Sequence, residues 1–87
     1  MTTSPLDDRI RDAIKRLLAS RADTATICPS EAARDVEPAD WRGLMPRVRD
    51  VALAMTRAGE IEITQGGRVL SITKPLRGPI RLRTAKR

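Results

Sequence analysis

The chain has 87 residues and a mass of 9.6 kDa, which fits one domain and excludes multidomain enzymes and large barrels. It contains no histidine and one cysteine, so it lacks the commonest general base, the commonest metal ligand and any intrachain disulfide. Hydrophobic residues make up 40% of the chain and Trp41 is the one aromatic residue, so we expect an aliphatic core. This composition argues against an enzyme, a metal and a cofactor.

The excess positive charge lies in the last part of the chain. The net charge is +6; residues 1–62 hold ten bases and eleven acids, whereas residues 63–87 hold seven bases and no acid. Arginine outnumbers lysine by 14 to 3. Because a guanidinium binds phosphates and carboxylates bidentately, this bias fits anion recognition, although a GC-rich genome would produce the same bias.

Nothing in the sequence indicates a membrane segment. No apolar run reaches the roughly 18 residues that span a bilayer, and residues 1–8 lack the basic and then apolar pattern of a signal peptide. With a single cysteine, the chain is expected to be cytoplasmic.

Two helices are predicted in the first half of the chain. Ser4 and Pro5 are typical of a helix start, and apolar residues then recur every three or four positions until a helix end near Ser20. In the loop that follows, Ile27 is expected to anchor in the core or to form a very short strand. A second, short helix is predicted from Pro29 to Val36.

A third helical region is predicted over residues 38–58. Val48, Val51 and Met55 lie on one stripe at helical spacing, but Pro46 interrupts the pattern. We expect either a kink at Pro46 or a turn around Trp41 followed by a main helix from Pro46. Gly59 is the predicted terminator.

The last third of the chain changes its period. Two alternating runs flank Gly66-Gly67, which predicts a β-hairpin over residues 60–73. Prolines and glycines then predict that residues 74–83 leave the hairpin as an extended basic C-terminal arm. Ile80 and Leu82 are expected to face the body of the protein, with the arginines between them facing solvent.

Three helices followed by a hairpin is the order of a winged helix-turn-helix of the α+β class. We predict such a domain over residues 1–83, including the arm, and a frayed basic tail over residues 84–87. In this architecture the third helix enters the major groove of DNA and the hairpin, or wing, contacts the backbone. The predicted partner is nucleic acid, with double-stranded DNA as the first choice. The candidate binding residues are Arg42, Arg49, Arg57, Arg68, Lys74, Arg77, Arg81 and Arg83.

The alternative is a winged-helix module for protein interaction, because a fold does not fix a function. In that case the basic arm would dock on an acidic protein, with Leu53 and Leu76 as exposed apolar anchors. Asp40 and Asp50 in the third helical region reduce its positive charge, which favours this alternative. Single-stranded RNA is the weakest candidate, because the chain has one aromatic residue for base stacking. The oligomeric state stays open.

Two further residues have both a structural and a functional interpretation. Cys28 stands at a predicted helix start, where a thiol can become a nucleophile, but a free cysteine more often behaves as a small hydrophobic residue. Trp41 could stack on a base, but a lone tryptophan more often fills the core of a small domain. We favour the structural interpretation for both residues.

Several segments together resemble a known family. They are residues 27–34 (ICPSEAAR), residues 59–67 (GEIEITQGG) and residues 78–83 (GPIRLR), with Trp41-Arg42, Met45, Val48-Arg49 and Ala52 between them. The chain is similar in these segments to a small bacterial family of winged-helix-like proteins of unknown function. The resemblance implies the fold and a cytoplasmic bacterial origin, and it assigns neither an activity nor catalytic residues.

Overall fold

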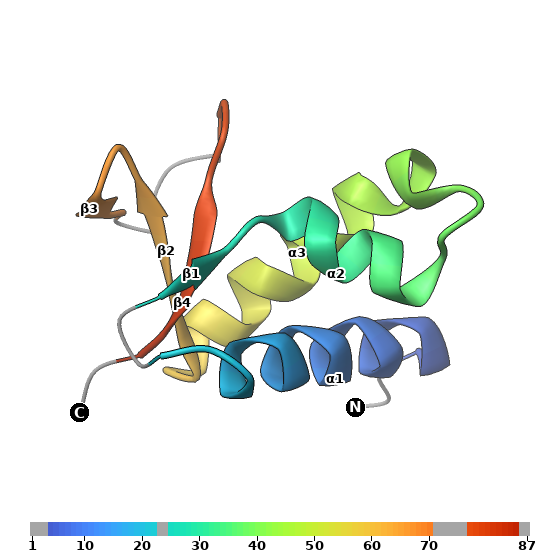
Figure 1. Cartoon of the computed structure of the whole chain (residues 1–87), viewed down its shortest axis with the longest axis horizontal. Coiled ribbons are helices and arrows are strands. Elements are labelled where there is room, and N and C mark those ends of the chain that lie inside the picture. The colour runs from blue at the N-terminus through green and yellow to red at the C-terminus, as the bar shows by residue number, and fades with distance from the viewer. Residues whose placement is uncertain (1–3, 23–24, 71–76, 86–87) are drawn as a thin grey trace.

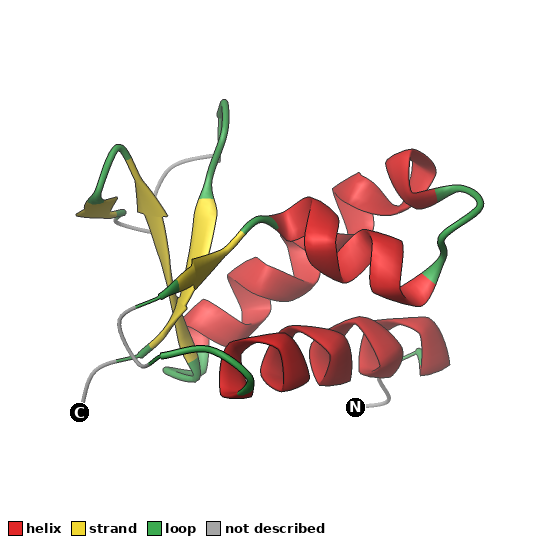
Figure 2. Cartoon of the chain, viewed as in Figure 1, coloured by secondary structure: helices red, strands yellow, loops and turns green. Residues whose placement is uncertain are grey.

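The chain folds into three helices and a four-stranded antiparallel sheet, and three of the strands follow the helices in the sequence (Figure 1). The fold comes from a computed structural model of the chain, and the structure describes residues 4–22, 25–70 and 77–85. In chain order the elements are α1 (Pro5–Ala19), β1 (Thr26–Ile27), α2 (Pro29–Val36), α3 (Trp41–Arg57), β2 (Ile61–Gln65), β3 (Arg68–Val69) and β4 (Arg81–Thr84). The helices gather on one side of the molecule and the strands on the other (Figure 2). The predicted α+β class and the three helices are confirmed.

The helix ends follow the signals in the sequence. At the start of α1, the backbone N–H of Asp7 donates to Ser4 Oγ at 3.1 Å, and Pro5 occupies the first turn. At the end of α3, Gly59 has a φ of +78° and its N–H donates to the Thr56 carbonyl at 3.0 Å. The N–H of Glu60 donates to the Met55 carbonyl at 2.9 Å, so the last carbonyls of α3 have partners.

α3 is one helix that runs through Pro46. The predicted alternative of a turn followed by a helix from Pro46 is therefore wrong, because the helix already begins at Trp41. Pro46 is the sixth residue of α3 and has no N–H to donate to the Arg42 carbonyl. The packing of the buried residues Val48, Val51 and Met55 keeps the segment helical despite this loss.

The strand order is β1-β4-β2-β3, and all neighbouring strands are antiparallel. The predicted hairpin around Gly66-Gly67 is present as β2 and β3. The predicted C-terminal arm is wrong for residues 81–84, which form the strand between β1 and β2, but Ile80 and Leu82 are buried as expected. Thr84, placed by the sequence in a frayed tail, ends β4 opposite Ile61, while residues 86–87 lie outside the described part of the chain.

The core is aliphatic, as the composition predicts, and lies between the helices and the inner face of the sheet. Leu82 occupies its centre, because it pairs with Ile63 on one side and with Ile27 on the other, and all three side chains are fully buried. The predicted anchoring of Ile27 is confirmed. The largest fully buried side chains are Ile10, Ile14, Ile27, Val48, Met55, Ile63 and Leu82. Trp41 is only partly buried, and it packs against the margin of this core.

Candidate nucleic-acid interface

The side of α3 that faces away from the core carries three of the candidate arginines. Arg42, Arg49 and Arg57 are spaced so that they lie roughly along one line of the helix. Arg42 and Arg57 are exposed and Arg49 is half-buried, whereas the opposite side of α3 is buried in the core. We call this line of arginines the α3 stripe.

Asp50 of α3 stands seven residues before Arg57, so it lies on the same side of the helix as that end of the α3 stripe, at the border that faces α1. Asp50 lines a groove of about 300 Å³ between α1 and α3, together with Asp7 and Asp8 of α1. Arg47 lines the same groove and its guanidinium contacts the Asp7 carboxylate at 3.3 Å. The Asp50 carboxylate therefore lies between the α3 stripe and α1, and Asp40, the other acidic residue of this region, stands at the N-terminal cap of α3.

Side-chain donors connect the residues before β4 to α3 and to β2. Arg49 Nη2 donates to the Gly78 carbonyl, and Gln65 Nε2 donates to the carbonyls of Arg77 and Pro79, the latter at 3.0 Å. These contacts bring the backbone of exposed Arg77 close to the α3 stripe. Residues 77–79 and the β2–β3 hairpin together form what we call the wing.

The strand register gives the direction of Arg68. Arg68 pairs with Gln65, and Gln65 lies on the same face of β2 as the buried residues Ile61 and Ile63. Cross-strand partners share a face, so Arg68 lies on the face of the sheet that the helices cover, at the open end of the hairpin where it is exposed. Arg68 is thus a wing cation on the same side of the sheet as α3, and the carbonyl of Arg77 accepts a hydrogen bond from Gln65 on that same face.

Arg81 and Arg83 lie on the opposite face of the sheet. Arg81 pairs with Thr64 and Arg83 pairs with Glu62, and both partners alternate with the inward-facing residues of β2. Arg81 donates from Nε to Thr26 Oγ1 at 2.8 Å and from Nη2 to the Thr26 carbonyl at 3.2 Å. Arg83 contacts Glu62 Oε1 at 2.7 Å, and both side chains of this ion pair are mostly buried.

The eight predicted residues therefore do not form one surface. Arg42, Arg49, Arg57 and Arg68 belong to the helix side, and Arg77 is connected to it through its carbonyl, whereas Arg81 and Arg83 belong to the outer face of the sheet. Lys74 falls outside the described residues, as does Leu76 of the alternative hypothesis. Sequence spacing alone cannot separate these groups, because the strand register that divides them depends on pairing between distant segments.

Trp41 lies among arginines rather than deep in the core. The guanidinium carbon of Arg34 is 4.3 Å from the centre of the indole ring, and that of Arg42 is 4.6 Å from it. Such cation–π contacts hold the planar guanidinium groups in place. Arg34 was not among the predicted residues, because its approach to Trp41 joins α2 to α3 and leaves no signal in the local sequence.

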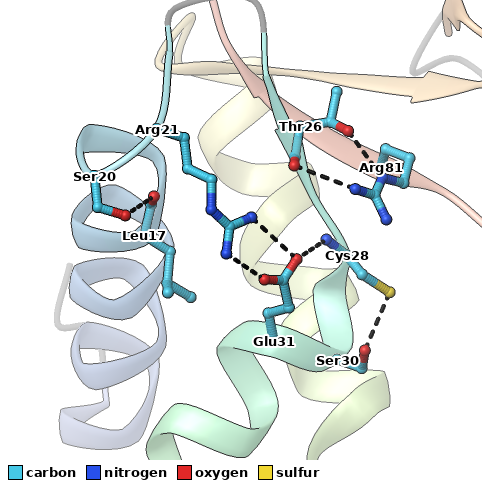
Figure 3. Close-up of polar contacts among 8 residues, drawn as sticks. All are labelled: Leu17, Ser20, Arg21, Thr26, Cys28, Ser30, Glu31 and Arg81. Atoms are coloured by element: carbon cyan, nitrogen blue, oxygen red, sulfur yellow. Dashed lines mark hydrogen bonds and ion pairs between the residues drawn. The ribbon is translucent and has the colours of Figure 1, made fainter.

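Cys28 has a structural environment (Figure 3). Its backbone N–H donates to Glu31 Oε2 at 2.7 Å, and its Sγ accepts a hydrogen bond from Ser30 Oγ at 3.1 Å. The nearby guanidinium of Arg21 is directed at the Glu31 carboxylate, with Nη2 at 2.5 Å from Oε1. That hydrogen bond is the main reason why the pKa of Glu31 lies below its usual value, with a further contribution from the Cys28 N–H. The cluster caps α2, which supports the structural interpretation of Cys28.

Two further kinds of site are absent from the described part of the chain. Within residues 4–22, 25–70 and 77–85, no group of three or more histidine, cysteine, aspartate or glutamate residues could hold a metal ion. Across these same ranges no helix has the length and apolar character needed to cross a membrane.

Comparison with known proteins places this domain in a family. A search of curated proteins found no match to the chain. A family model does match residues 7–85, which include all three helices and all four strands. The match runs through the ICPSE and GPIRLR segments that carry the resemblance seen in the sequence. The chain therefore belongs to the family described as protein of unknown function DUF3253.

Proposed function

We propose that this protein is a winged helix-turn-helix domain that binds double-stranded DNA, rather than an enzyme. The element order supports the proposal: α2 and α3 are consecutive helices joined by a short turn, and strands follow them directly. The short strand β1 between α1 and α2 pairs with the last strand, β4, which closes the sheet beside the helices. On this interpretation, α3 is the recognition helix, and the β2–β3 hairpin with residues 77–79 is the wing.

The observation that carries the proposal is the distribution of paired and unpaired cations. Within the described residues, Arg57, Arg68 and Arg77 have no carboxylate at ion-pair distance, and Arg42 and Arg49 contact an indole ring and a carbonyl. The arginines that do pair with carboxylates lie on other surfaces. A guanidinium without a carboxylate partner can bind phosphate without first breaking an ion pair.

In the proposed complex, most of the affinity comes from phosphate contacts. Arg57 on α3 and Arg68 and Arg77 on the wing would bind backbone phosphates and release counterions from the duplex. The helix α3 has no asparagine or glutamine to pair with adenine, so direct base recognition is limited to contacts of an arginine with guanine. We therefore expect strong dependence on salt and modest dependence on sequence.

The test is fluorescence anisotropy with a labelled duplex of about 25 base pairs at several salt concentrations. Wild-type protein should bind, with an affinity that falls steeply as salt rises. The double variant Arg57→Ala, Arg68→Ala should bind about ten- to a hundredfold more weakly and lower the slope of log affinity against log salt by about 2. The matched control is Arg16→Ala, Arg47→Ala, which removes two arginines that pair with Asp35 and Asp7.

The control variant should keep the wild-type slope. Equal losses in the two double variants would mean that net charge alone drives binding, and would overturn the proposed interface. Absence of a complex even at low salt would favour the interaction-module alternative, in which the same cations dock on an acidic protein. Circular dichroism of each variant excludes loss of the fold as the cause.

A further inference from the structure

Two side chains hold three consecutive backbone carbonyls of the wing. Gln65, the last residue of β2, donates from Nε2 to the carbonyls of Arg77 and Pro79. Arg49, from the α3 stripe, donates from Nη2 to the carbonyl of Gly78 between them. We call this set of contacts between Arg49, Gln65 and residues 77–79 the latch.

The residue at the centre of the latch has a backbone conformation that suits glycine. Gly78 has a φ of +72°, a region that other residues rarely adopt. A Cβ at this position would lie 3.4 Å from Gln65 Nε2, so a larger side chain would also meet the amide that holds the neighbouring carbonyls. The backbone of residues 77–79 is thus shaped so that its carbonyls can be reached from both α3 and β2.

The latch has a consequence for Arg49. This side chain is half-buried, and its guanidinium is directed at a carbonyl of its own chain, whereas Arg57 and Arg68 are exposed. A guanidinium that donates to a carbonyl fixes the distance between the two elements that it joins. Here those elements are the helix and the wing, which carry the two groups of cations.

We propose that the latch sets the spacing between the α3 stripe and the wing, and that Arg49 is a positioning residue rather than a phosphate contact. This inference rests on the proposed function. Phosphates on the two sides of a duplex groove have a fixed separation, so cations held at one spacing bind them without loss of conformational entropy at binding. A single strand adjusts its own shape to the protein and gains much less from this spacing. The latch therefore selects duplex DNA over single-stranded DNA.

The experiment compares Arg49→Ala, Gln65→Ala and their double variant in binding to a labelled duplex and to one labelled strand of it. Gln65→Ala removes no charge, so it separates positioning from charge. It should weaken duplex binding about three- to tenfold with an unchanged salt slope, and change single-strand binding by less than about twofold. Gly78→Ala should behave in the same way. Thr84→Ala, a neutral change on the exposed end of β4, is the matched control and should leave both affinities unchanged.

The two arginine-containing variants test the role of Arg49 directly. Arg49→Ala should match Gln65→Ala in both affinity and slope, and the double variant should be no weaker than about twice the weaker single variant, because both changes open the same latch. The proposal is overturned if Arg49→Ala lowers the salt slope by about 0.9 while Gln65→Ala leaves duplex affinity unchanged, which is the behaviour of a phosphate contact.

Amide hydrogen exchange without DNA separates failure of the latch from failure of the proposed function. In Gln65→Ala and Arg49→Ala, the amides of Gly78 and Ile80 should exchange faster than in wild type, with the amides of α1 unchanged. Faster exchange in a protein that binds no duplex would retain the latch as a structural device, but it would overturn its role in selecting DNA. Unchanged exchange would overturn the latch whatever the protein binds.

Discussion

Arginines on the two sides of this molecule have different partners. On the side formed by α1 and α2, Arg16 contacts Asp35 at 2.7 Å and Arg21 contacts Glu31 at 2.5 Å. On the side formed by α3 and the wing, Arg49 contacts a carbonyl, and Arg57 has no carboxylate at ion-pair distance within the described residues; Arg47, on the edge of α3 that faces α1, pairs with Asp7. Arg16 and Arg21 thus join elements of the first side, whereas Arg57 on the second side is available to an external anion.

This comparison shows why charge counted along the chain differs from charge presented by a surface. The three arginines of the α3 stripe belong to residues 1–62, a segment that is slightly acidic overall. Arg83 belongs to the basic end of the chain, yet its charge is matched by Glu62. The proposed interface therefore combines cations from both parts of the sequence and leaves out part of the segment with the highest charge.

The largest effect on the free energy of unfolding is expected at Leu82, because its strand, β4, supports both sides of the molecule. Leu82 is the fully buried centre of β4, the strand that carries the paired Arg83 and holds the end of the wing. Leu82→Ala should lower the free energy of unfolding by about 2–5 kcal/mol, because it leaves a cavity between Ile27 and Ile63. Urea denaturation followed by circular dichroism measures this change.

Thr84→Ala, on the same strand but exposed, serves as the control and should stay within about 0.5 kcal/mol of wild type. A loss below about 1 kcal/mol in Leu82→Ala would contradict the central position of β4. It would instead fit the peripheral arm that the sequence predicts.

The elements of this fold are predictable from the sequence wherever their signals are local. Ser4 and Gly59 mark helix ends through contacts within a few residues, and Gly66-Gly67 marks its hairpin in the same way. The position of β4 is not predictable in this manner. The alternation of Ile80 and Leu82 with arginines is the same for a surface arm and for a half-buried strand, and only pairing with β1 and β2 distinguishes them.

The same limit applies to the candidate site. Helical spacing places Arg42, Arg49 and Arg57 together, and the structure agrees because that spacing is a local property of α3. The partners that decide the role of each cation are distant in sequence: Gly78 lies 29 residues from Arg49, and Glu62 lies 21 residues from Arg83. Sequence spacing therefore identifies candidate cations, but it cannot show which of them are already occupied.

A smaller effect is expected from Glu60→Gln, because this substitution leaves two cations without the carboxylate that pairs with them. Glu60 Oε1 contacts both Arg11 and Lys15, the latter at 2.9 Å, so one carboxylate holds two cations of α1 against the start of β2. Glu60→Gln should lower the free energy of unfolding by about 1 kcal/mol, because partly exposed ion pairs contribute modestly to stability. In the anisotropy assay it should raise duplex affinity at low salt by about twofold, because the released cations add to non-specific binding.

Glu37→Gln is the matched control for this change. It alters the net charge equally, but Glu37 is exposed and forms no ion pair with the described residues. If both variants bound duplex equally well and were equally stable, the contacts of Glu60 with Arg11 and Lys15 would have no measurable role.

The smallest expected effect concerns the pH dependence of the paired side. The hydrogen bond from Arg21 lowers the pKa of Glu31 in the folded protein, so the carboxylate stabilises the fold at pH values above its unfolded pKa. This stabilisation is lost as the pH falls from that value through the lower folded pKa.

Glu31→Gln should therefore be less stable than wild type by up to about 1 kcal/mol at neutral pH, and the difference should shrink in acid. Asp35, whose pKa is lowered by Arg16, is present in both proteins and does not affect the comparison. Urea denaturation between neutral and strongly acidic pH measures the difference, and a constant difference across that range would mean that the charge of Glu31 does not contribute to stability.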